Sequence, residues 1–156
     1  MSAVREVVAA VVDPELRVVT IAELGILRDV TEDPGTGAVT VTITPTYSGC
    51  PALDVIRADI RAALAAAGHP EAEVRTVLRP AWSTDMITPA GRSKLASAGI
   101  APPPPAGGPV PLRLSARCVR CGSPDTEEIS RFGATPCKAL WRCRACAEPF
   151  ELVKPL

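Results

Sequence analysis

The chain has 156 residues, of which 47% are hydrophobic and 22% charged, with 17 lysines and arginines against 17 aspartates and glutamates. This length suits one compact domain with a small appendage, and the balanced charge excludes a global field that would draw the chain to nucleic acid or to an anionic membrane. The start does not resemble a signal peptide, and no apolar run reaches the roughly 18 residues that a membrane span needs. We therefore expect a cytoplasmic protein that recognises its partners locally.

The first half of the chain predicts the order helix, strand, strand, helix, strand. Valines at helical spacing over 4–12 predict a first helix that ends before Pro14. Thr20 and Glu23 have the spacing of a capping box, and Gly25 can end the short turn that they open. The remaining elements are strands over 26–32 and 38–44 joined by the turn 33–37, a helix from Pro51 to Gly68, a strand over 73–78 and a further helix over 89–98.

A proline-rich segment, 100–111, divides the chain. Its prolines and glycines cannot form a helix or a central strand, so we expect a partly extended linker. The predicted domains are therefore 1–99 and 112–156, in an α+β fold. The second domain has few residues for a core, so a metal must supply much of its stability. Its candidate core residues are Leu112, Leu114, Ile129, Phe132, Leu140, Trp141, Phe150 and Leu152.

Four cysteines of the tail form two CxxC pairs, Cys118 with Cys121 and Cys143 with Cys146, separated by 21 residues. Each pair brings two sulfurs from one tight turn to the same ion, and four thiolates suit a tetrahedral site. Six cysteines would also allow disulfides, but CxxC spacing without a secretion signal favours a metal in a reducing compartment. We expect a structural zinc ribbon, with a single iron or an iron–sulfur cluster as the alternative at these ligands.

Cys137 lies six residues before Cys143 and has no CxxC partner. Two interpretations stay open for it. It is either a small buried hydrophobic residue or spare thiol, or a reactive or exchange ligand beside the metal.

Cys50 lies immediately before Pro51, the predicted first residue of a helix. Free N–H groups and the positive end of the helix dipole favour a thiolate at this position, which would be a nucleophile or a metal ligand. The alternative is a cysteine that only caps the helix and packs.

Three acidic residues are candidates to accompany Cys50. Asp13 and Glu15 flank a proline and could face the same pocket, although such a pair is more often a solvated turn. Asp85, with Trp82, is a candidate to pack over the Cys50 loop. An ordinary core tryptophan is the alternative at position 82.

Three stretches of the first half resemble the MIP-eighteen or SufT-like iron–sulfur assembly domain: 13–15 (Asp-Pro-Glu), 21–30 and the loop 44–51 around Cys50. Nearly the whole chain is similar to the D subunits of phenylacetyl-CoA epoxidase, also called PaaD or PaaJ. That similarity adds 82–85, 91–95, 99–103, 132–140 and 148–151. Val119 in the first knuckle and Pro136 before Cys137 depart from the family pattern, and neither removes a ligand.

The resemblance implies a role in aerobic phenylacetate degradation, where a di-iron oxygenase acts on phenylacetyl-CoA and an iron–sulfur flavin reductase delivers electrons. It implies an accessory subunit rather than an enzyme, consistent with the lack of Glu-x-x-His pairs and of a nucleotide fingerprint. The implied task is maturation or repair of the reductase cluster or of the oxygenase metal centre. Cys50 would hold metal or a cluster transiently, alone or across a homodimer, and the ribbon would position a partner subunit.

Three rival functions remain. A pure docking module would use the ribbon and leave Cys50 inert. A nucleic-acid-binding ribbon has the arginines that it needs but little aromatic interleaving to stack bases. A thiol–disulfide enzyme would need a CxxC that no metal occupies.

Overall fold

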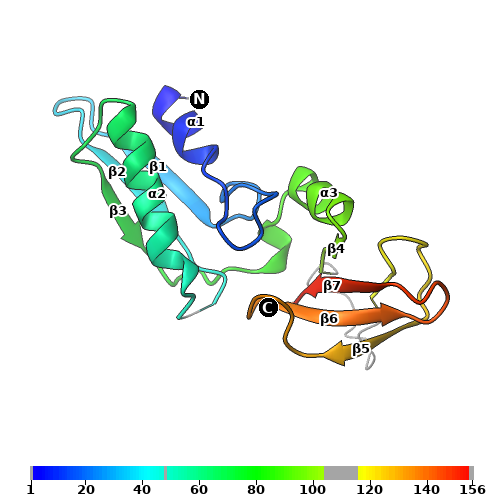
Figure 1. Cartoon of the computed structure of the whole chain (residues 1–156). Helices are drawn as coiled ribbons and strands as arrows, with labels where there is room; N and C mark the ends of the chain where they lie inside the picture. Colours follow the sequence, from blue (N-terminus) through cyan, green and yellow to red (C-terminus); the bar gives the residue numbers. More distant parts are fainter. Residues whose placement is uncertain (1, 48, 104–115, 155–156) are drawn as a thin grey trace. The chain divides into compact units, whose positions relative to one another are not determined.

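The structure is a computed structural model that describes residues 2–47, 49–103 and 116–154. The chain divides into two compact units, Met1–Gly91 and Arg92–Leu156, and each is described by itself. Figure 1 shows their elements. The predicted boundary lay at residue 99, and most of the predicted linker, 104–111, falls outside the described residues. None of the helices in the described part of the chain combines the length and the apolar composition that a membrane-spanning segment requires.

The first unit has a three-stranded sheet covered by two helices. Its elements are α1 (Ala3–Ala9), β1 (Leu27–Glu32), β2 (Val39–Ile43), α2 (Ala52–Ala66) and β3 (Glu73–Thr76). The strand order is β1-β2-β3, with β1 antiparallel and β3 parallel to β2. The two helices contact one another, α1 contacts β1 and α2 contacts β3, so both lie on one face of the sheet (Figure 1). The predicted order of elements is confirmed.

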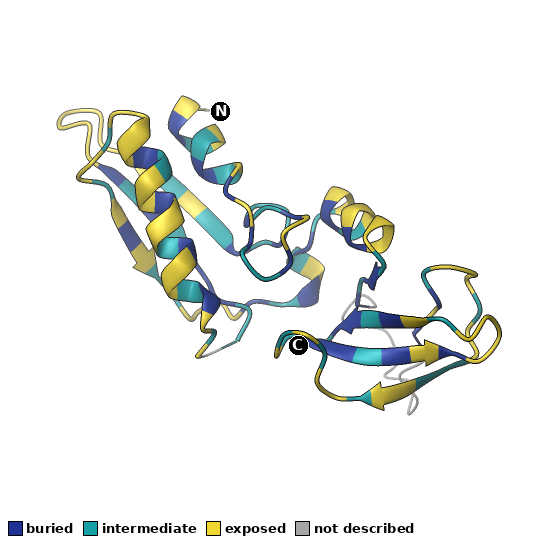
Figure 2. Ribbon diagram, in the orientation of Figure 1, coloured by how far each residue is buried: buried dark blue, intermediate teal, exposed yellow. Residues whose placement is uncertain are grey.

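The core of this unit follows the predicted periodicities. Val39, Val41 and Ile43 alternate with half-buried threonines along β2. On α2, Ile56, Ile60 and Leu64 are almost completely buried, whereas much of the outward side of the helix is exposed (Figure 2). Leu53, near the start of the helix, is only half-buried. Ala52 takes the core position because it is one turn before Ile56.

The first helix is shorter than predicted. It ends at Ala9, and the backbone then forms a hairpin-like loop in which Val12 bridges Thr20. The N–H of Asp13 donates to the carbonyl of Val19 at 3.0 Å. The backbone after Ala9 therefore bonds to the segment that follows the loop and does not continue the helix. The capping box is confirmed, because Thr20 N donates to Glu23 Oε2 at 2.9 Å and Glu23 N donates to Thr20 Oγ1 at 3.1 Å.

The second unit contains most of α3 (Pro89–Ser97) and a four-stranded sheet. The strands are β4 (Ile100–Ala101), β5 (Thr126–Ser130), β6 (Lys138–Cys143) and β7 (Pro149–Val153), in the order β4-β7-β6-β5. Neighbouring strands pair antiparallel except β4, which is parallel to β7. The sequence placed 100 and 101 in the linker, and the structure places them in an edge strand. An edge position tolerates the prolines that follow.

A small core lies on one face of this second sheet. Trp141, Phe150 and Leu152 are buried there together with Cys118 and Cys143, as part of one cluster of buried side chains. Leu140 is half-buried, and Leu112 and Leu114 lie outside the described residues. The expectation that Ile129 and Phe132 belong to this core is wrong: they are 52% and 72% exposed.

Candidate functional site: a four-cysteine metal site and the Cys50 loop

The four CxxC cysteines converge at one end of the second sheet. Cys118 and Cys121 lie on the turn before β5. Cys143 is the last residue of β6, and Cys146 lies on the turn between β6 and β7. All four sulfurs lie within 4.8 Å of one another, with 3.7 Å from Cys118 to Cys146 and 3.6 Å from Cys121 to Cys143. A tetrahedron with metal–sulfur bonds of about 2.3 Å has sulfur–sulfur edges of about 3.8 Å. The donor set and its spacing therefore fit one tetrahedral metal ion.

Backbone N–H groups of both turns point at the sulfurs. Arg120 N lies 3.4 Å from Cys118 Sγ, and Cys146 N lies 3.5 Å from Cys143 Sγ. Hydrogen bonds from backbone N–H groups lower the pKa of Cys118 to about 7. The N–H of Cys121 has the larger effect, and the N–H of Arg120 has a smaller one. The N–H of Glu148 lowers the pKa of Cys146, but burial and the neighbouring sulfurs outweigh it and raise that pKa to about 12. Sulfurs packed this closely need a cation to become thiolates together.

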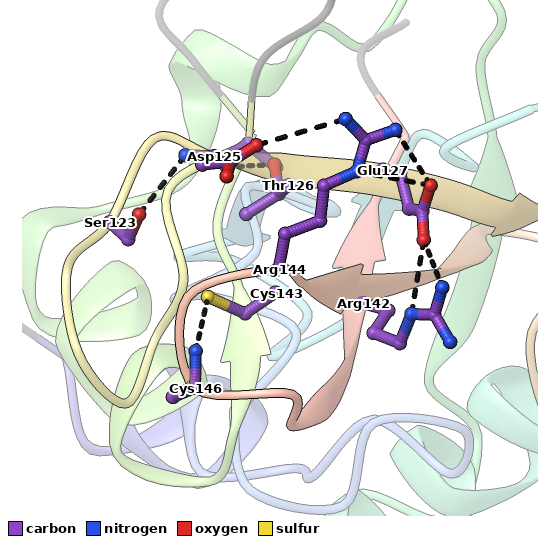
Figure 3. Close-up of polar contacts among 9 residues, drawn as sticks. Ser123, Asp125, Thr126, Glu127, Arg142, Cys143, Arg144 and Cys146 are labelled. Atoms are coloured by element: carbon purple, nitrogen blue, oxygen red, sulfur yellow. Dashed lines mark hydrogen bonds and ion pairs between the residues drawn. The ribbon is translucent and has the colours of Figure 1, made fainter.

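Charged residues beside the metal site are paired with one another. Glu127 on β5 accepts hydrogen bonds from Arg142 and from Arg144, the two residues that flank Cys143 (Figure 3). Arg144 also lies 3.9 Å from Asp125, and Arg120 lies 3.5 Å from Glu148. These acids offset much of the positive charge that the sequence shows in the tail.

Cys50 lies two residues before α2, which begins at Ala52 with Pro51 at its N-cap, one residue later than predicted. Its carbonyl accepts from Leu53 N at 3.2 Å, and its thiol is half-buried. Of the two interpretations left open for Cys50, a thiolate is the one that its surroundings disfavour. Burial raises the pKa of Cys50 above its ordinary value of 9.0, and the charges of Glu15 and Asp13 add to the rise. The N–H of Ala52 and the side chain of Tyr47 lower the pKa by less than this.

The charges of Asp13 and Glu15 both raise the pKa of the Cys50 thiol, in line with the alternative in which the two acids face the Cys50 pocket. Asp13 is not in a solvated turn: it is 6% exposed, and its Oδ1 accepts from Glu15 N at 2.9 Å and from Leu16 N at 2.8 Å. Burial raises the pKa of Asp13, although these two N–H groups lower it. This carboxylate both closes the turn and places negative charge near the thiol.

The other candidates have separate places. Trp82 is a core residue whose Nε1 donates to Leu24 O at 2.8 Å, and Asp85 is exposed in the short η1 (Thr84–Met86). Cys137 comes just before β6, whereas Cys143 ends that strand, which puts them about 20 Å apart along it. Cys137 is outside the four-sulfur cluster, and its Sγ lies 3.1 Å from Thr135 Oγ1. This position favours a spare thiol over an exchange ligand.

The chain is similar to a protein of Escherichia coli (strain K12) that is named as the D subunit of 1,2-phenylacetyl-CoA epoxidase. The two are 46% identical over 142 residues, which cover 91% of this chain and 85% of that protein. The chain belongs to the family of phenylacetyl-CoA epoxidase D subunits. Residues 103–154 match the PaaD zinc beta ribbon domain, and residues 1–78 match the iron–sulfur cluster assembly protein family. In this member of the D-subunit family, the two matches coincide with the four-cysteine site and with Cys50.

The first unit of the D subunit also has the fold of a solved structure. It is the crystal structure of a domain of unknown function, DUF59, from Bacillus anthracis, which is 34% identical in sequence and superposes with a TM-score of 0.53. The match covers 59% of this chain and 87% of the Bacillus anthracis chain. This likeness confirms the α+β fold predicted for the first half.

Sequence reasoning missed two features of this D subunit. Tyr47 interacts with the Cys50 thiol, and its place three residues before Cys50 was the available signal. Lys138 is buried and pairs with Glu151 at 2.6 Å between Nζ and Oε2. The two residues are 13 positions apart in the sequence and lie on neighbouring strands, so their ion pair could not be predicted without the strand pairing.

Proposed function

We propose that this D subunit is a non-catalytic component of phenylacetyl-CoA epoxidase and that, in maturation or repair, it supplies iron or an iron–sulfur cluster to a partner subunit. Cys50 is the residue that carries the cargo, and the four-cysteine site holds a structural zinc. The single observation behind this proposal is the place of Cys50, a half-buried thiol at a helix start inside the part of the chain that matches the iron–sulfur assembly family.

The raised pKa of Cys50 suits a carrier. At neutral pH the thiol holds its proton, so an incoming iron ion must displace that proton before it binds. This competition weakens binding compared with a preformed thiolate. The nearby carboxylates of Asp13 and Glu15 then offset part of the positive charge of the ion. Cargo is therefore held weakly enough to be released.

Cys50 provides one protein sulfur, whereas a cluster is held by about four ligands. Among the described residues, the four-cysteine site is the one group of three or more ligands placed closely enough to hold a metal ion. The remaining ligands for cargo at Cys50 must come from the receiving subunit, from a second copy of the chain or from a small thiol. Shared ligation gives a direct route for transfer, because the receiving subunit replaces the donor ligands one at a time.

The structural zinc has a different role. Its four sulfurs come from this chain and fill a tetrahedral site, with Cys118 and Cys143 buried and Cys121 and Cys146 exposed, so no position is left open for a further ligand. The pairing of the neighbouring arginines with Glu127, Asp125 and Glu148 also supports a protein partner over nucleic acid.

The test is anaerobic loading with iron and sulfide, followed by mixing with the metal-free reductase or oxygenase subunit. Wild type and the Cys137→Ser control should bind iron and restore the partner's cluster absorbance or metal content, whereas Cys50→Ser should keep its zinc and lose both. If Cys50→Ser transfers iron as well as wild type does, the carrier role is wrong, and the alternative of a docking module with an inert Cys50 replaces it.

A further inference from the structure

The loop 131–137, here called the Phe132 loop, carries an aromatic side chain that the core of the second unit does not use. Phe132 is 72% exposed, and Ile129, three residues earlier, is 52% exposed. Single apolar side chains are common on protein surfaces, so the support under the ring and the charges beside it decide whether Phe132 is an anchor. Aromatic residues, phenylalanine among them, are enriched in the cores of protein interfaces.

The backbone of the Phe132 loop is held in place from several directions. Phe132 N donates to Ser130 Oγ at 3.1 Å, and Gly133 N donates to Lys138 O at 2.8 Å. Ala134 N donates to Glu151 Oε1 at 3.0 Å. The ring is therefore presented on a preorganised support, and a partner that binds it avoids much of the cost of ordering a flexible loop.

A buried ion pair lies under this loop. Lys138 and Glu151 have side chains that are 6% and 25% exposed, and they meet at 2.6 Å. A Cβ atom at Gly133 would lie 3.0 Å from Glu151 Oε1 and 3.2 Å from Lys138 Cβ, so the backbone passes directly over the pair. The carboxylate of Glu151 is thus engaged by Lys138 and Ala134, and it offers little negative charge to the outer surface.

Among the described residues, two basic side chains belong to the surroundings of the ring. Lys154 Nζ lies 4.7 Å from the centre of the Phe132 ring and donates to Pro136 O at 2.8 Å. The side chain of Arg131 is 87% exposed. Its Nε lies 4.0 Å from Oε1 of Glu128, which is at the longest distance that still counts as an ion pair. A surface that fits this one is therefore apolar at its centre and acidic at its rim.

We propose that the Phe132 loop docks the chain on another subunit of the epoxidase, with the Phe132 ring in an apolar pocket and with carboxylates of that subunit facing Lys154 and Arg131. This inference rests on the proposed function only in taking an epoxidase subunit as the partner. It assigns to the second unit a task that is separate from the transfer chemistry at Cys50.

The test measures the affinity of the zinc-loaded full chain for the purified reductase subunit and for the purified oxygenase complex of the same system, each immobilised in turn. Phe132→Ala should weaken binding to one of them about 30-fold, as expected for an interface anchor. Leu78→Ala is the matched control, because Leu78 is 62% exposed in the first unit. Its affinity should stay within about twofold of wild type.

Reversing the charge of a basic side chain beside Phe132 tests whether acidic groups of the partner face this surface. Lys154→Glu should weaken the same binding and reduce its dependence on salt concentration, whereas Arg61→Glu on the exposed side of α2 should change neither. Zinc content and Trp141 fluorescence equal to wild type would show that each variant is folded. The proposal is overturned if Phe132→Ala binds as wild type does, or if the wild type binds neither the reductase nor the oxygenase.

Cys50→Ser separates this proposal from the carrier role. It should bind the partner with wild-type affinity and yet fail to transfer iron. A Cys50→Ser variant that still transfers iron, together with a Phe132→Ala variant that binds weakly, would overturn the carrier role and leave the docking surface standing.

Discussion

The indole nitrogen of Trp82 donates to the backbone carbonyl of Leu24 at 2.8 Å, which joins the segment after β3 to the turn before β1. Thr88 N donates to Glu23 O at 2.9 Å and strengthens the same connection. Gly25 lies at the centre of this contact. A Cβ atom there would be 2.5 Å from Met86 Cβ and 2.7 Å from Met86 O. The capping-box turn therefore depends on a residue without a side chain.

Gly25→Ala should destabilise the first unit by about 3 kcal/mol. Roughly 1 kcal/mol comes from forcing alanine into the left-handed region, since φ is +74° at this glycine, and the remainder comes from the clash with Met86. The measurement is urea unfolding followed by Trp82 fluorescence in a Trp141→Phe background. Gly37→Ala is the matched control, because its φ is +69° and no atom lies within 4 Å of the added Cβ. Equal losses in the two variants would show that the contact with Met86 is unimportant.

Local rules were enough to predict most of the first unit. The alternation along β2, the helical spacing on α2 and the capping box of Thr20 and Glu23 each depend on neighbours within a few residues. The early end of α1 could not be predicted in this way. It depends on the bridge between Val12 and Thr20 and on the burial of Asp13, which exist only after the loop has folded back.

Removal of the metal from the four-cysteine site should unfold the second unit and leave the first one intact. The four sulfurs supply on the order of 10 kcal/mol through the metal, and few apolar residues are buried in that unit. Trp141 and Trp82 are 4% and 6% exposed and report on separate units. After treatment with a strong chelator, a Trp82→Phe protein should show red-shifted emission, whereas a Trp141→Phe protein should not. A Trp141 signal that survives complete loss of zinc would contradict the structural role of the metal.

Glu151→Gln should destabilise the second unit by about 2 kcal/mol at neutral pH. The change leaves Lys138 charged and buried, and this costs more than the hydrogen bonds that glutamine retains. Urea unfolding of the zinc-bound protein, followed by Trp141 fluorescence, measures the loss. The double variant Lys138→Met, Glu151→Leu is the control: it removes both charges and should recover much of the stability. A double variant that is no more stable than Glu151→Gln would assign the loss to packing.

The four metal ligands were predicted from spacing, whereas the surroundings of both cysteine sites were not. A CxxC pair fixes its own geometry, because two sulfurs three residues apart on one turn must converge. The pKa of Cys50 instead depends on how deeply the thiol is buried and on acids about 35 residues away in the sequence. Phe132 was assigned to the core because it is large and apolar, and only the place of the strands shows that its ring faces outward.

Glu15→Gln should make Cys50 more reactive toward iodoacetamide. Burial first, and then the charge of Glu15, raise the pKa of the thiol above 9.0, so at pH 8 most of Cys50 is protonated. Loss of this negative charge lowers the pKa and increases the thiolate fraction, and the lower intrinsic nucleophilicity of the thiolate cancels part of the gain. We expect a rate increase of about twofold at pH 8 that disappears at a pH well above the pKa, where Cys50 is ionised in both proteins.

The measurement uses zinc-bound protein with Cys137→Ser, in which Cys50 is the one cysteine outside the four-sulfur site. Alkylation is followed by mass spectrometry across the pH range. Glu32→Gln, which removes an exposed carboxylate at the end of β1, is the control and should leave the rate unchanged. If Glu15→Gln and Glu32→Gln react alike, the Glu15 carboxylate does not act on Cys50. In that case burial, with the charge of Asp13, keeps the thiol protonated.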